Sequence, residues 1–465
     1  SAASRPASPE GAVTAPAARP AATPRGEFRA LAALALPLAL AQLAQIAINT
    51  TDLVMMGWLG TEALAAGGLA VNIWILPALF GIGVAAAIPP LVAEALGAKR
   101  PRRVRRMVRQ GLWVTAAVTV PPALALAFAA PVLEALGQTP AVATAAEAYL
   151  RAAALGLPFA AFTMVLRGFV TSFGHTRAVL AVMAAAVLLN ALSNYALMFG
   201  HFGLPRLELV GAGVSSSLVN VATFAALAGR AAAYRRYRVL ARLWRPDWAV
   251  FAAVAKLGLP IGLTLLLEVG MFSAAALLVG TLGPVPLAAH NVALQLCAII
   301  FMVPLGLSQA ATIRVALAAG RRDGEGVRRV GRAATALAVA IMTVPATAFL
   351  LVPHALVRPF LADPEQQGPL VDTAVALLGV AALFQIADGL QLVAAGLLRG
   401  LQDTTVPMLY AALGYWLCGL GVATALLWLA DGGARGVWVG LLTGLTVTAA
   451  LALRRFFRRA GRLDA

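Results

Sequence analysis

The sequence is poor in charge, histidine and cysteine, and each shortage excludes a kind of protein. Charged residues make up 12% of the 465 residues, against roughly 25% in soluble domains, so they cannot cover a globular surface. Two cysteines and four histidines supply neither a disulfide framework nor paired metal ligands. The Gly-x-x-x-x-Gly-Lys-Ser/Thr nucleotide loop is missing as well. We therefore expect a membrane protein that has no cofactor and is not driven by ATP.

Long apolar runs fill the chain, which is 61% hydrophobic. A helix needs about 20 apolar residues to cross the bilayer, and this criterion predicts an all-α polytopic fold with twelve transmembrane helices. Residues 1–26 are rich in Ala and Pro and are expected to be a disordered leader. The predicted spans are 30–57, 64–96, 107–136, 143–172, 176–200, 209–233, 250–281, 287–318, 330–360, 369–399, 404–430 and 433–456.

An internal repeat relates the two halves of the chain. Under a shift of 223 residues the chain matches itself without a gap over a stretch of two spans, and a weaker repeat, at a shift of 228 residues, relates the fourth and fifth spans to the tenth and eleventh. We expect two pseudo-symmetric six-helix bundles, related by an axis along the membrane normal, around a central cavity. The matched pairs include Pro37 with Pro260, Gly83 with Gly306, Gly97 with Gly320 and, in the weaker match, His175 with Asp403.

The basic residues indicate membrane topology rather than a nucleic-acid partner, although the formal net charge is +17. They lie in short loops between apolar spans, and with the N-terminus inside, 32 of the 36 Lys and Arg residues are inside. The positive-inside rule then places both termini in the cytoplasm of a multi-pass inner-membrane protein, which we expect to be a monomer. The expected units are an N-terminal bundle (27–234), a cytoplasmic basic linker (235–249), a C-terminal bundle (250–457) and a cytoplasmic tail (458–465).

Three carboxylates lie deep in predicted spans, at Asp52, Glu268 and Asp388. Ionisable groups inside a membrane are costly and generally face a cavity or a partner. We interpret these three as cation-coupling residues that bind Na⁺ or carry H⁺ and attract a cationic substrate. If the ion is Na⁺, Glu268 and Asp388 are its expected ligands; the sequence leaves Na⁺ and H⁺ both open. Pairing with a buried Arg or amide, which only locks helices together, is the structural alternative.

Amide side chains accompany these acids at helical spacing. On the first span they recur at three- and four-residue steps that end at Asp52. Their oxygens suit a monovalent cation, and hydrogen bonding between helices is the alternative. Phe384, one turn before Asp388, either packs or turns its ring toward a bound cation. The expected supporting and substrate-cavity residues are Gln42, Gln45, Asn49, Asn190, Asn194, Asn291, Gln295, Phe384, Gln385 and Gln391.

The repeat separates the acids from the scaffold. Glu268 is matched by Gln45, and Asp52 is matched by Ala275. Packing needs common to both copies do not explain acids present in one copy, so the halves share a scaffold and divide the chemistry. Charged groups nearer the span ends are assigned lesser roles: Arg167, Arg399 and Asp403 as loop or gating contacts, and Glu94 and Arg314 as interfacial anchors.

Several motifs, in order and at twelve-helix spacing, resemble the multidrug and toxic compound extrusion (MATE) family, and within it the NorM-type branch. The resemblance covers about residues 27–458. The motifs are Ala41-Gln-Leu-Ala-Gln45, Thr51-Asp-Leu-Val-Met-Met-Gly57, Gly258-Leu-Pro-Ile261, Leu267-Glu-Val269, Phe384-Gln-Ile-Ala-Asp-Gly-Leu-Gln391, Gly396-Leu-Leu-Arg-Gly400, Asp403-Thr404, Pro407 and Tyr415-Trp416.

The resemblance implies a secondary antiporter that exports cationic, lipophilic compounds in exchange for Na⁺ or H⁺. It carries the family's cation site onto Glu268 and Asp388, its acid on the first helix onto Asp52 and its amide on the fifth onto Asn190. The presence of Glu268, and of Asn194 where the DinF-type branch usually has an acid, favours the NorM type. The alternatives are a lipid-linked precursor flippase of the same superfamily and, more remotely, an intramembrane enzyme, for which we find no catalytic motif.

Overall fold

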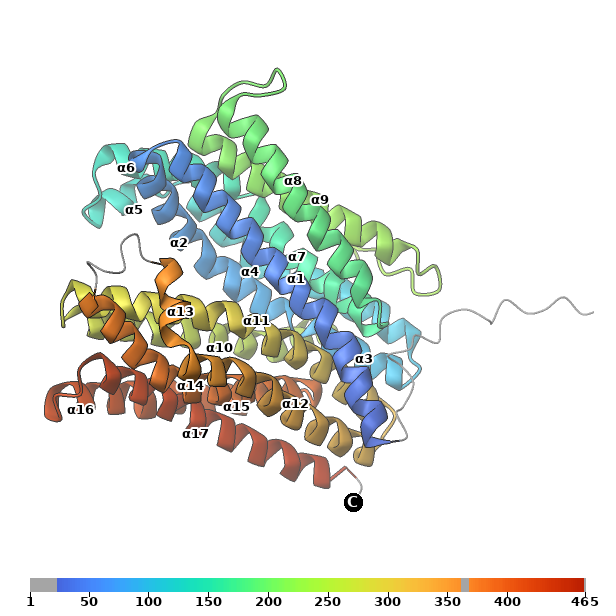
Figure 1. Cartoon of the computed structure of the whole chain (residues 1–465). Helices are drawn as coiled ribbons and strands as arrows, with labels where there is room; N and C mark the ends of the chain where they lie inside the picture. The colour runs from blue at the N-terminus through green and yellow to red at the C-terminus, as the bar shows by residue number, and fades with distance from the viewer. Residues whose placement is uncertain (1–22, 361–367, 464–465) are drawn as a thin grey trace, which may run out of the picture.

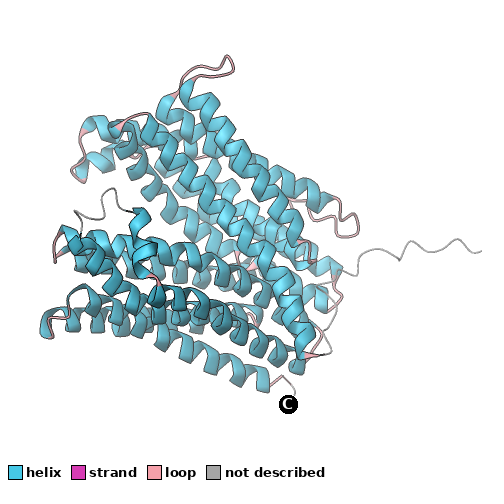
Figure 2. Ribbon diagram, in the orientation of Figure 1, coloured by secondary structure: helices cyan, strands magenta, loops and turns pink. Residues whose placement is uncertain are grey.

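The computed structural model describes residues 23–360 and 368–463, and every regular element in these ranges is a helix (Figure 2). Most of the expected leader and the last two residues of the expected tail lie outside the described residues. Within the described chain, the all-helical prediction is confirmed.

The N-terminal half follows the predicted spans, and three of them, at 64–96, 107–136 and 143–172, are each broken into two helices. The span predicted at 64–96 consists of two helices that meet at Ala86-Ala87, just before Pro89 and Pro90, since proline cannot donate to the preceding turn. The helices are α1 (Pro24–Trp58), α2 (Thr61–Ala85), α3 (Ile88–Gly97), α4 (Pro101–Leu126), α5 (Ala130–Ala135), α6 (Pro140–Ala153), α7 (Gly156–Ser172), α8 (Thr176–Phe199) and α9 (Glu208–Ala232).

The C-terminal half repeats this plan; α11 and α14 are long and unbroken where the first half has breaks, while the span predicted at 330–360 is broken after Leu351. Its penultimate span is α-helical at both ends and π-helical in the middle. The elements are α10 (Trp248–Gly280), α11 (Pro284–Gly320), α12 (Gly324–Leu351), α13 (Pro353–Val357), η2 (Arg358–Phe360), α14 (Gly368–Gly400), α15 (Thr405–Ala411), the π-helical η3 (Ala412–Leu420), α16 (Gly421–Leu429) and α17 (Gly433–Gly461).

Eleven helical segments of the described chain are long and apolar enough to cross a membrane. The remaining predicted span, 107–136, is formed by α4 and α5. The first turns of α4 carry Arg102, Arg103, Arg105 and Arg106, which lower its mean hydropathy. The structure therefore agrees with a twelve-helix plan.

The two halves are separate bundles that pack against each other at one end (Figure 1). We call this the basic end, because the arginine-rich segments 99–109, 230–256, 314–332 and 454–462 connect or end the helices there. Two core clusters at the basic end combine both halves: one joins Val254 and Leu257 to the first bundle, and another joins Leu31 and Leu38 to the second. Toward the opposite end each core cluster belongs to one half alone. The bundles thus meet at the basic end and diverge toward the other.

Repeat-related glycines allow the backbones to approach where the halves meet. Gly97 at the end of α3 lies against Gly320 at the end of α11: a Cβ built on Gly97 would be 3.2 Å from the Cα of Gly320. A Cβ on Gly83 of α2 would likewise be 2.6 Å from the Cα of Gly262 in α10. Since Gly97 and Gly320 are equivalent in the repeat, their contact lies at the pseudo-twofold axis.

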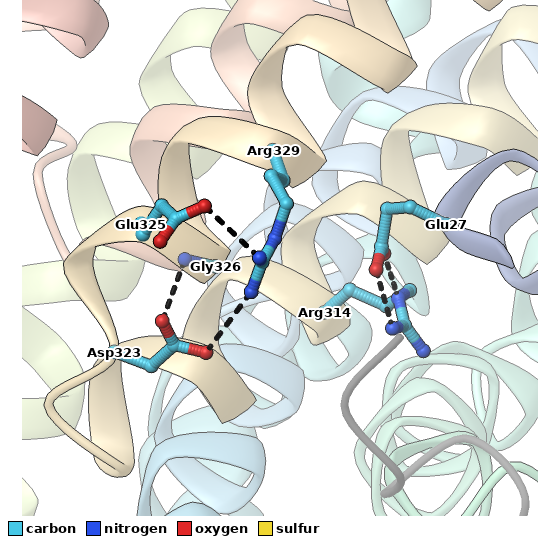
Figure 3. A network of polar contacts seen from close by, with 6 residues as sticks. All are labelled: Glu27, Arg314, Asp323, Glu325, Gly326 and Arg329. Carbon is cyan, nitrogen blue, oxygen red and sulfur yellow. Dashed lines mark hydrogen bonds and ion pairs between the residues drawn. The ribbon is translucent and has the colours of Figure 1, made fainter. Parts of the chain in front are cut away.

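A buried ion pair also joins the halves at the basic end. Glu27 in the first turn of α1 pairs with Arg314 of α11, and both are less than a tenth exposed (Figure 3). The prediction that Arg314 is an interfacial anchor is wrong, because a carboxylate from the other half covers it. Figure 3 also shows Asp323, whose side chain accepts a hydrogen bond from Gly326 N and so caps α12. Arg329 forms ion pairs with both Asp323 and Glu325.

The linker between the halves lies on α4. Gln110 donates to the Arg245 carbonyl at 3.1 Å, and Trp113 donates to the Leu243 carbonyl at 2.7 Å. At its end, Asp247 caps α10 and accepts a 2.5 Å hydrogen bond from Arg106, which lowers the pKa of the Asp247 carboxyl. The side chains of α4 therefore satisfy polar groups that an irregular segment leaves unpaired.

Adding a methyl group at the pseudo-twofold axis should move the two halves apart at the basic end. In Gly320→Ala the new Cβ would overlap the Glu94 carbonyl oxygen and lie 3.1 Å from Ala98 N, and such overpacking costs about 1–3 kcal/mol. We expect longer distances between spin labels placed on the two halves at this end, together with a lower melting temperature in detergent. Gly229→Ala is the control, because nothing lies within 4 Å of its built Cβ. Unchanged distances in Gly320→Ala would contradict the close approach.

Breaking the buried ion pair should destabilise the protein far more than breaking an exposed one. Glu27→Gln leaves Arg314 without its carboxylate, and losing one partner of a buried pair typically costs about 3–5 kcal/mol. Glu325→Gln, which removes a partner of Arg329 that is 68% exposed, should cost at most about 1 kcal/mol. Thermal denaturation in detergent compares the two variants. Equal melting temperatures would mean that the Glu27–Arg314 pair does not hold the halves together.

Candidate functional site

Two of the three predicted acids come together in the C-terminal half. Glu268 extends from α10 and Asp388 from α14, with exposed fractions of 7% and 3%. The two carboxylates are near enough to influence each other electrostatically. Burying like charges side by side is unfavourable unless a cation or a proton joins them. The pair therefore has the character expected of an ion-binding or proton-carrying site.

Amide and phenol groups surround these acids and retain unused hydrogen-bonding capacity. Gln391 donates to the Tyr415 hydroxyl at 2.5 Å, and both side chains are buried. Within the described residues, Asp388 Oδ1, Gln391 Oε1 and both polar atoms of Gln385 make no hydrogen bond. Buried polar atoms without partners are rare and call for an explanation. Here they leave carboxylate and amide oxygens available to a cation or its water.

The π-helical segment η3 shapes one wall of this site. It carries Tyr415, and the next residue, Trp416, donates from Nε1 to the Leu267 carbonyl of α10 at 3.2 Å. A Cβ on Gly270 would be 2.9 Å from Trp416 Cζ2, so the indole lies close to the α10 backbone. π-Helical turns occur frequently at functional sites. The sequence analysis identified Tyr415-Trp416 as a motif but did not predict this geometry.

Arg399 lies in the last turn of α14, as predicted, but has a neighbour that the sequence analysis did not predict. It was assigned to a helix end as a loop or gating contact, yet it shares with Glu268 and Gln391 the wall of a cavity of about 30 Å³. Its charge is near enough to Glu268 to interact with it. Arg399 is 11 residues from Asp388 on α14, about 16 Å along a straight helix. Glu268 belongs to α10 and is far from Arg399 in sequence, so the sequence alone did not indicate that the two residues are neighbours.

Aromatic rings pack around Phe384, which lies one turn from Asp388 in the direction away from the basic end. Phe384 makes edge-to-face contacts with Trp438 at 5.2 Å and with Phe272 at 6.2 Å between ring centroids. Trp438 in turn donates to His290 Nδ1 at 3.1 Å. Of the two roles considered for Phe384, these contacts favour packing.

In the N-terminal half, Asp52 has its own pair of amides. Its Oδ1 accepts hydrogen bonds from Asn190 Nδ2 at 2.8 Å and Asn194 Nδ2 at 2.6 Å. Both asparagines belong to α8 and are fully buried, and their Oδ1 atoms make no hydrogen bond within the described residues. The structure thus brings together three residues that the sequence placed on two spans. It also fits the alternative of an interhelical lock.

The other predicted polar residues fall into an exposed group and a bridging group. Gln45 and Asn49 on α1, and Asn291 and Gln295 on α11, are exposed. Helices α1 and α11 cross at Gly306, and these four residues lie on the side of the crossing that is farther from the basic end. Exposed amides are unfavourable in lipid, so this side of the crossing suits a water-filled space.

Gln42 behaves differently from the exposed amides. Its Oε1 accepts a 2.6 Å hydrogen bond from Arg167 of α7, and Arg167 also donates to Gln309 Oε1 of α11 at 3.3 Å. Arg167 is buried and links the two halves. Its gating role remains a prediction, and this link between the halves is consistent with it. Gln42 belongs to this bridge rather than to either acid.

No group of three or more His, Cys, Asp or Glu side chains suited to a metal ion occurs in the described ranges. The two acid sites offer one or two carboxylates each, supplemented by amide oxygens. Such oxygen-rich surroundings suit a weakly held monovalent cation or a proton better than a transition metal, which prefers imidazole or thiolate ligands.

Comparison with known proteins places the chain in a family. The MatE family model matches residues 37–196 and 260–424, and these segments begin 223 residues apart. Proteins named "Probable multidrug resistance protein NorM" from Mesorhizobium japonicum and Bradyrhizobium diazoefficiens are each 43% identical to it, over 94% of both chains. A solved structure described as the outward-facing conformation of a multidrug resistance MATE family transporter has a TM-score of 0.82, with 19% identity, covering 95% of this chain and 97% of that one. The resemblance inferred from the motifs is confirmed.

The Gln391–Tyr415 hydrogen bond lends itself to a double-mutant cycle. Tyr415→Phe or Gln391→Leu alone leaves a buried polar group unpaired, which costs about 1–3 kcal/mol. Gln391→Leu/Tyr415→Phe removes both partners and should be less destabilised than the sum of the single variants. Melting temperatures in detergent measure the three. Strictly additive effects would show that the two groups do not interact.

Proposed function

The chain belongs to the MatE family, and we propose that it is a multidrug efflux antiporter that exports cationic lipophilic compounds in exchange for Na⁺ or H⁺. The names of its relatives support multidrug export and agree with a transporter rather than an enzyme. The observation that carries the ion-coupled mechanism is the buried acid pair, Glu268 and Asp388, with unpaired amide oxygens beside it.

The acid pair supplies the competition that antiport requires. Buried negative charge can be neutralised by a coupling ion or by a cationic substrate, and placing both cations in the same small, buried space is unfavourable. Entry of the ion then favours release of the substrate, and the reverse. A ligand can shift a conformational equilibrium only by its differential affinity for the two states. Each ligand would exert its differential affinity for the two states by neutralising the charge on Glu268 and Asp388.

Asp52 provides a second place for a coupling ion. Two amide donors hold its carboxylate, and two amide oxygens remain available at Asn190 and Asn194. This arrangement supports the assignment of Asp52 as a coupling residue of the N-terminal half. The two sites lie on different bundles, so a change at one reaches the other through the contacts between halves.

The packing of the halves suggests alternating access. If the positive-inside rule places the basic end in the cytoplasm, the described conformation is closed to the cytoplasm and divergent toward the outside. Gly97, Gly320 and the Glu27–Arg314 pair then form the closed cytoplasmic contact. Pro37 and Pro260, buried and half-buried at equivalent positions in α1 and α10, are points at which these helices can bend.

Ethidium efflux from proteoliposomes tests both the activity and its coupling ion. When a Na⁺ gradient or a proton gradient is imposed, the wild-type protein should export ethidium under one of these two gradients. Glu268→Gln and Asp388→Asn should reduce gradient-driven export to the level of protein-free vesicles, because each removes charge from the shared pocket. Asp372→Asn is the matched control, since Asp372 is an exposed acid on the same helix as Asp388.

The alternatives give distinct outcomes in the same assay. If Glu268→Gln and Asp388→Asn transport normally while Asp52→Asn is inactive, coupling belongs to the N-terminal half. If no cation is exported under either gradient by correctly folded protein, the flippase alternative replaces antiport. The melting temperature of each variant distinguishes loss of coupling from loss of fold.

A further inference from the structure

A deep basic pocket at the end of α17 has no part in the proposed transport cycle. It has a volume of about 380 Å³, and its walls include one tyrosine, one leucine and five arginines. The five arginines occur at four-residue spacing in two stripes, so they lie on neighbouring faces of the helix. The lining residues are Tyr410, Leu451, Arg454, Arg455, Arg458, Arg459 and Arg462.

The two stripes differ in how their charge is neutralised. Asp403, at the start of the preceding span, accepts from Arg455 Nε at 2.5 Å and lies 3.2 Å from Arg459 Nε. No carboxylate of the described chain pairs with Arg454, Arg458 or Arg462, which are exposed. One carboxylate therefore faces five guanidinium groups, and most of the positive charge of the pocket is uncompensated. Arginine forks of this kind bind phosphate oxygens in a bidentate manner.

Stabilisation of the helix dipole does not account for the whole cluster. The favourable effect of cations on a helix C-terminus falls off within the last turn. Arg454 lies seven residues before the end of α17 at Gly461, about two turns inside the helix. A group placed that far inside, at the edge of the apolar span, serves another purpose.

The surroundings of the pocket fit a lipid better than a soluble anion. Leu451 forms part of its wall, and the chain next to Tyr410 presents Leu409, Leu413 and Leu417 at four-residue spacing, with exposed fractions of 55%, 42% and 68%. A phosphate in the pocket would thus have apolar surface nearby for acyl chains. Basic pockets at the ends of transmembrane helices are where anionic lipid headgroups bind.

The repeat places a related pocket in the other half. His175, which the repeat matches with Asp403, lines a basic pocket of about 280 Å³ together with Arg230. There the residue before the span is a histidine that hydrogen-bonds Tyr234 at 2.8 Å. Only the pocket in the C-terminal half has a carboxylate that orients two of its arginines.

We propose that the pocket formed by Tyr410 and the α17 arginines binds the phosphate headgroup of an anionic phospholipid. Arg454, Arg458 and Arg462 contact the phosphate oxygens, and Asp403 holds Arg455 and Arg459 in place behind them. The bound lipid fixes the end of α17 against α15 at the basic end. Neither Glu268 nor Asp388 lines this pocket, although Asp403 also lines the small cavity that contains Glu268.

Native mass spectrometry of the delipidated full-length protein, titrated with cardiolipin, tests the proposal. In Arg454→Gln/Arg458→Gln/Arg462→Gln we expect the tightest cardiolipin site to weaken by roughly tenfold or more, with one fewer lipid retained. The charge-matched control is Arg100→Gln/Arg102→Gln/Arg177→Gln, which removes three exposed arginines outside the pocket. This control should bind cardiolipin as the wild type does.

Three outcomes would overturn the proposal. Equal loss in both triple variants would mean diffuse attraction to charge, and unchanged binding in both would mean that the lipid binds elsewhere. Glycerol 3-phosphate, which carries the phosphate without acyl chains, identifies the source: if it displaces cardiolipin at equal concentration, the site is for a soluble phosphate. Equal melting temperatures of the lipid-free variants exclude misfolding as the cause of weaker binding.

Discussion

Close contact between backbones at the basic end is the constraint on which the rest of the structure depends. Each half begins with a helix that crosses to the other half: Leu31 and Leu38 of α1 pack on the second bundle, and Val254 and Leu257 of α10 pack on the first. Glycine at 83, 97, 262 and 320 lets these crossings be tight. Because the halves share core only at this end, their opposite ends are free to diverge, and the polar residues between them become accessible.

A symmetric scaffold carries an asymmetric set of charges. Gly83 and Gly97, which lie where the halves pack, are matched in the repeat by Gly306 and Gly320, whereas the ion pair Glu27–Arg314 and the acids Glu268 and Asp388 are not matched by charges of the same kind. Duplication explains the matched residues, since both copies must solve the same packing problem. The unmatched ones have to be explained by what each bundle does separately.

The sequence predicted the helices, the repeat and the main acids because each has a local signal. Apolar length predicts a span, a fixed offset exposes a repeat, and a carboxylate within an apolar run is conspicuous. The neighbours of Arg399 and Arg314 and the π-helical turn at Tyr415 were missed because they depend on residues far away in sequence. An arginine near a span end looks the same whether it faces lipid headgroups, as Arg458 does in our proposal, or a buried carboxylate.

The placement of Arg399 changes the charge balance of the proposed mechanism. With both acids ionised, Glu268 and Asp388 alone would carry two negative charges, and Arg399, which lines the same cavity as Glu268, would offset the charge of Glu268. Asp52 carries one negative charge among neutral amides; Arg167 does not offset it, because its partner Gln42 is ten residues away on α1, about 15 Å along a straight helix. Each half would then present a single net negative charge to one monovalent cation or proton. Two different sets of residues thus give equivalent electrostatics, which a duplicated antiporter needs if both halves are to respond to the same ion.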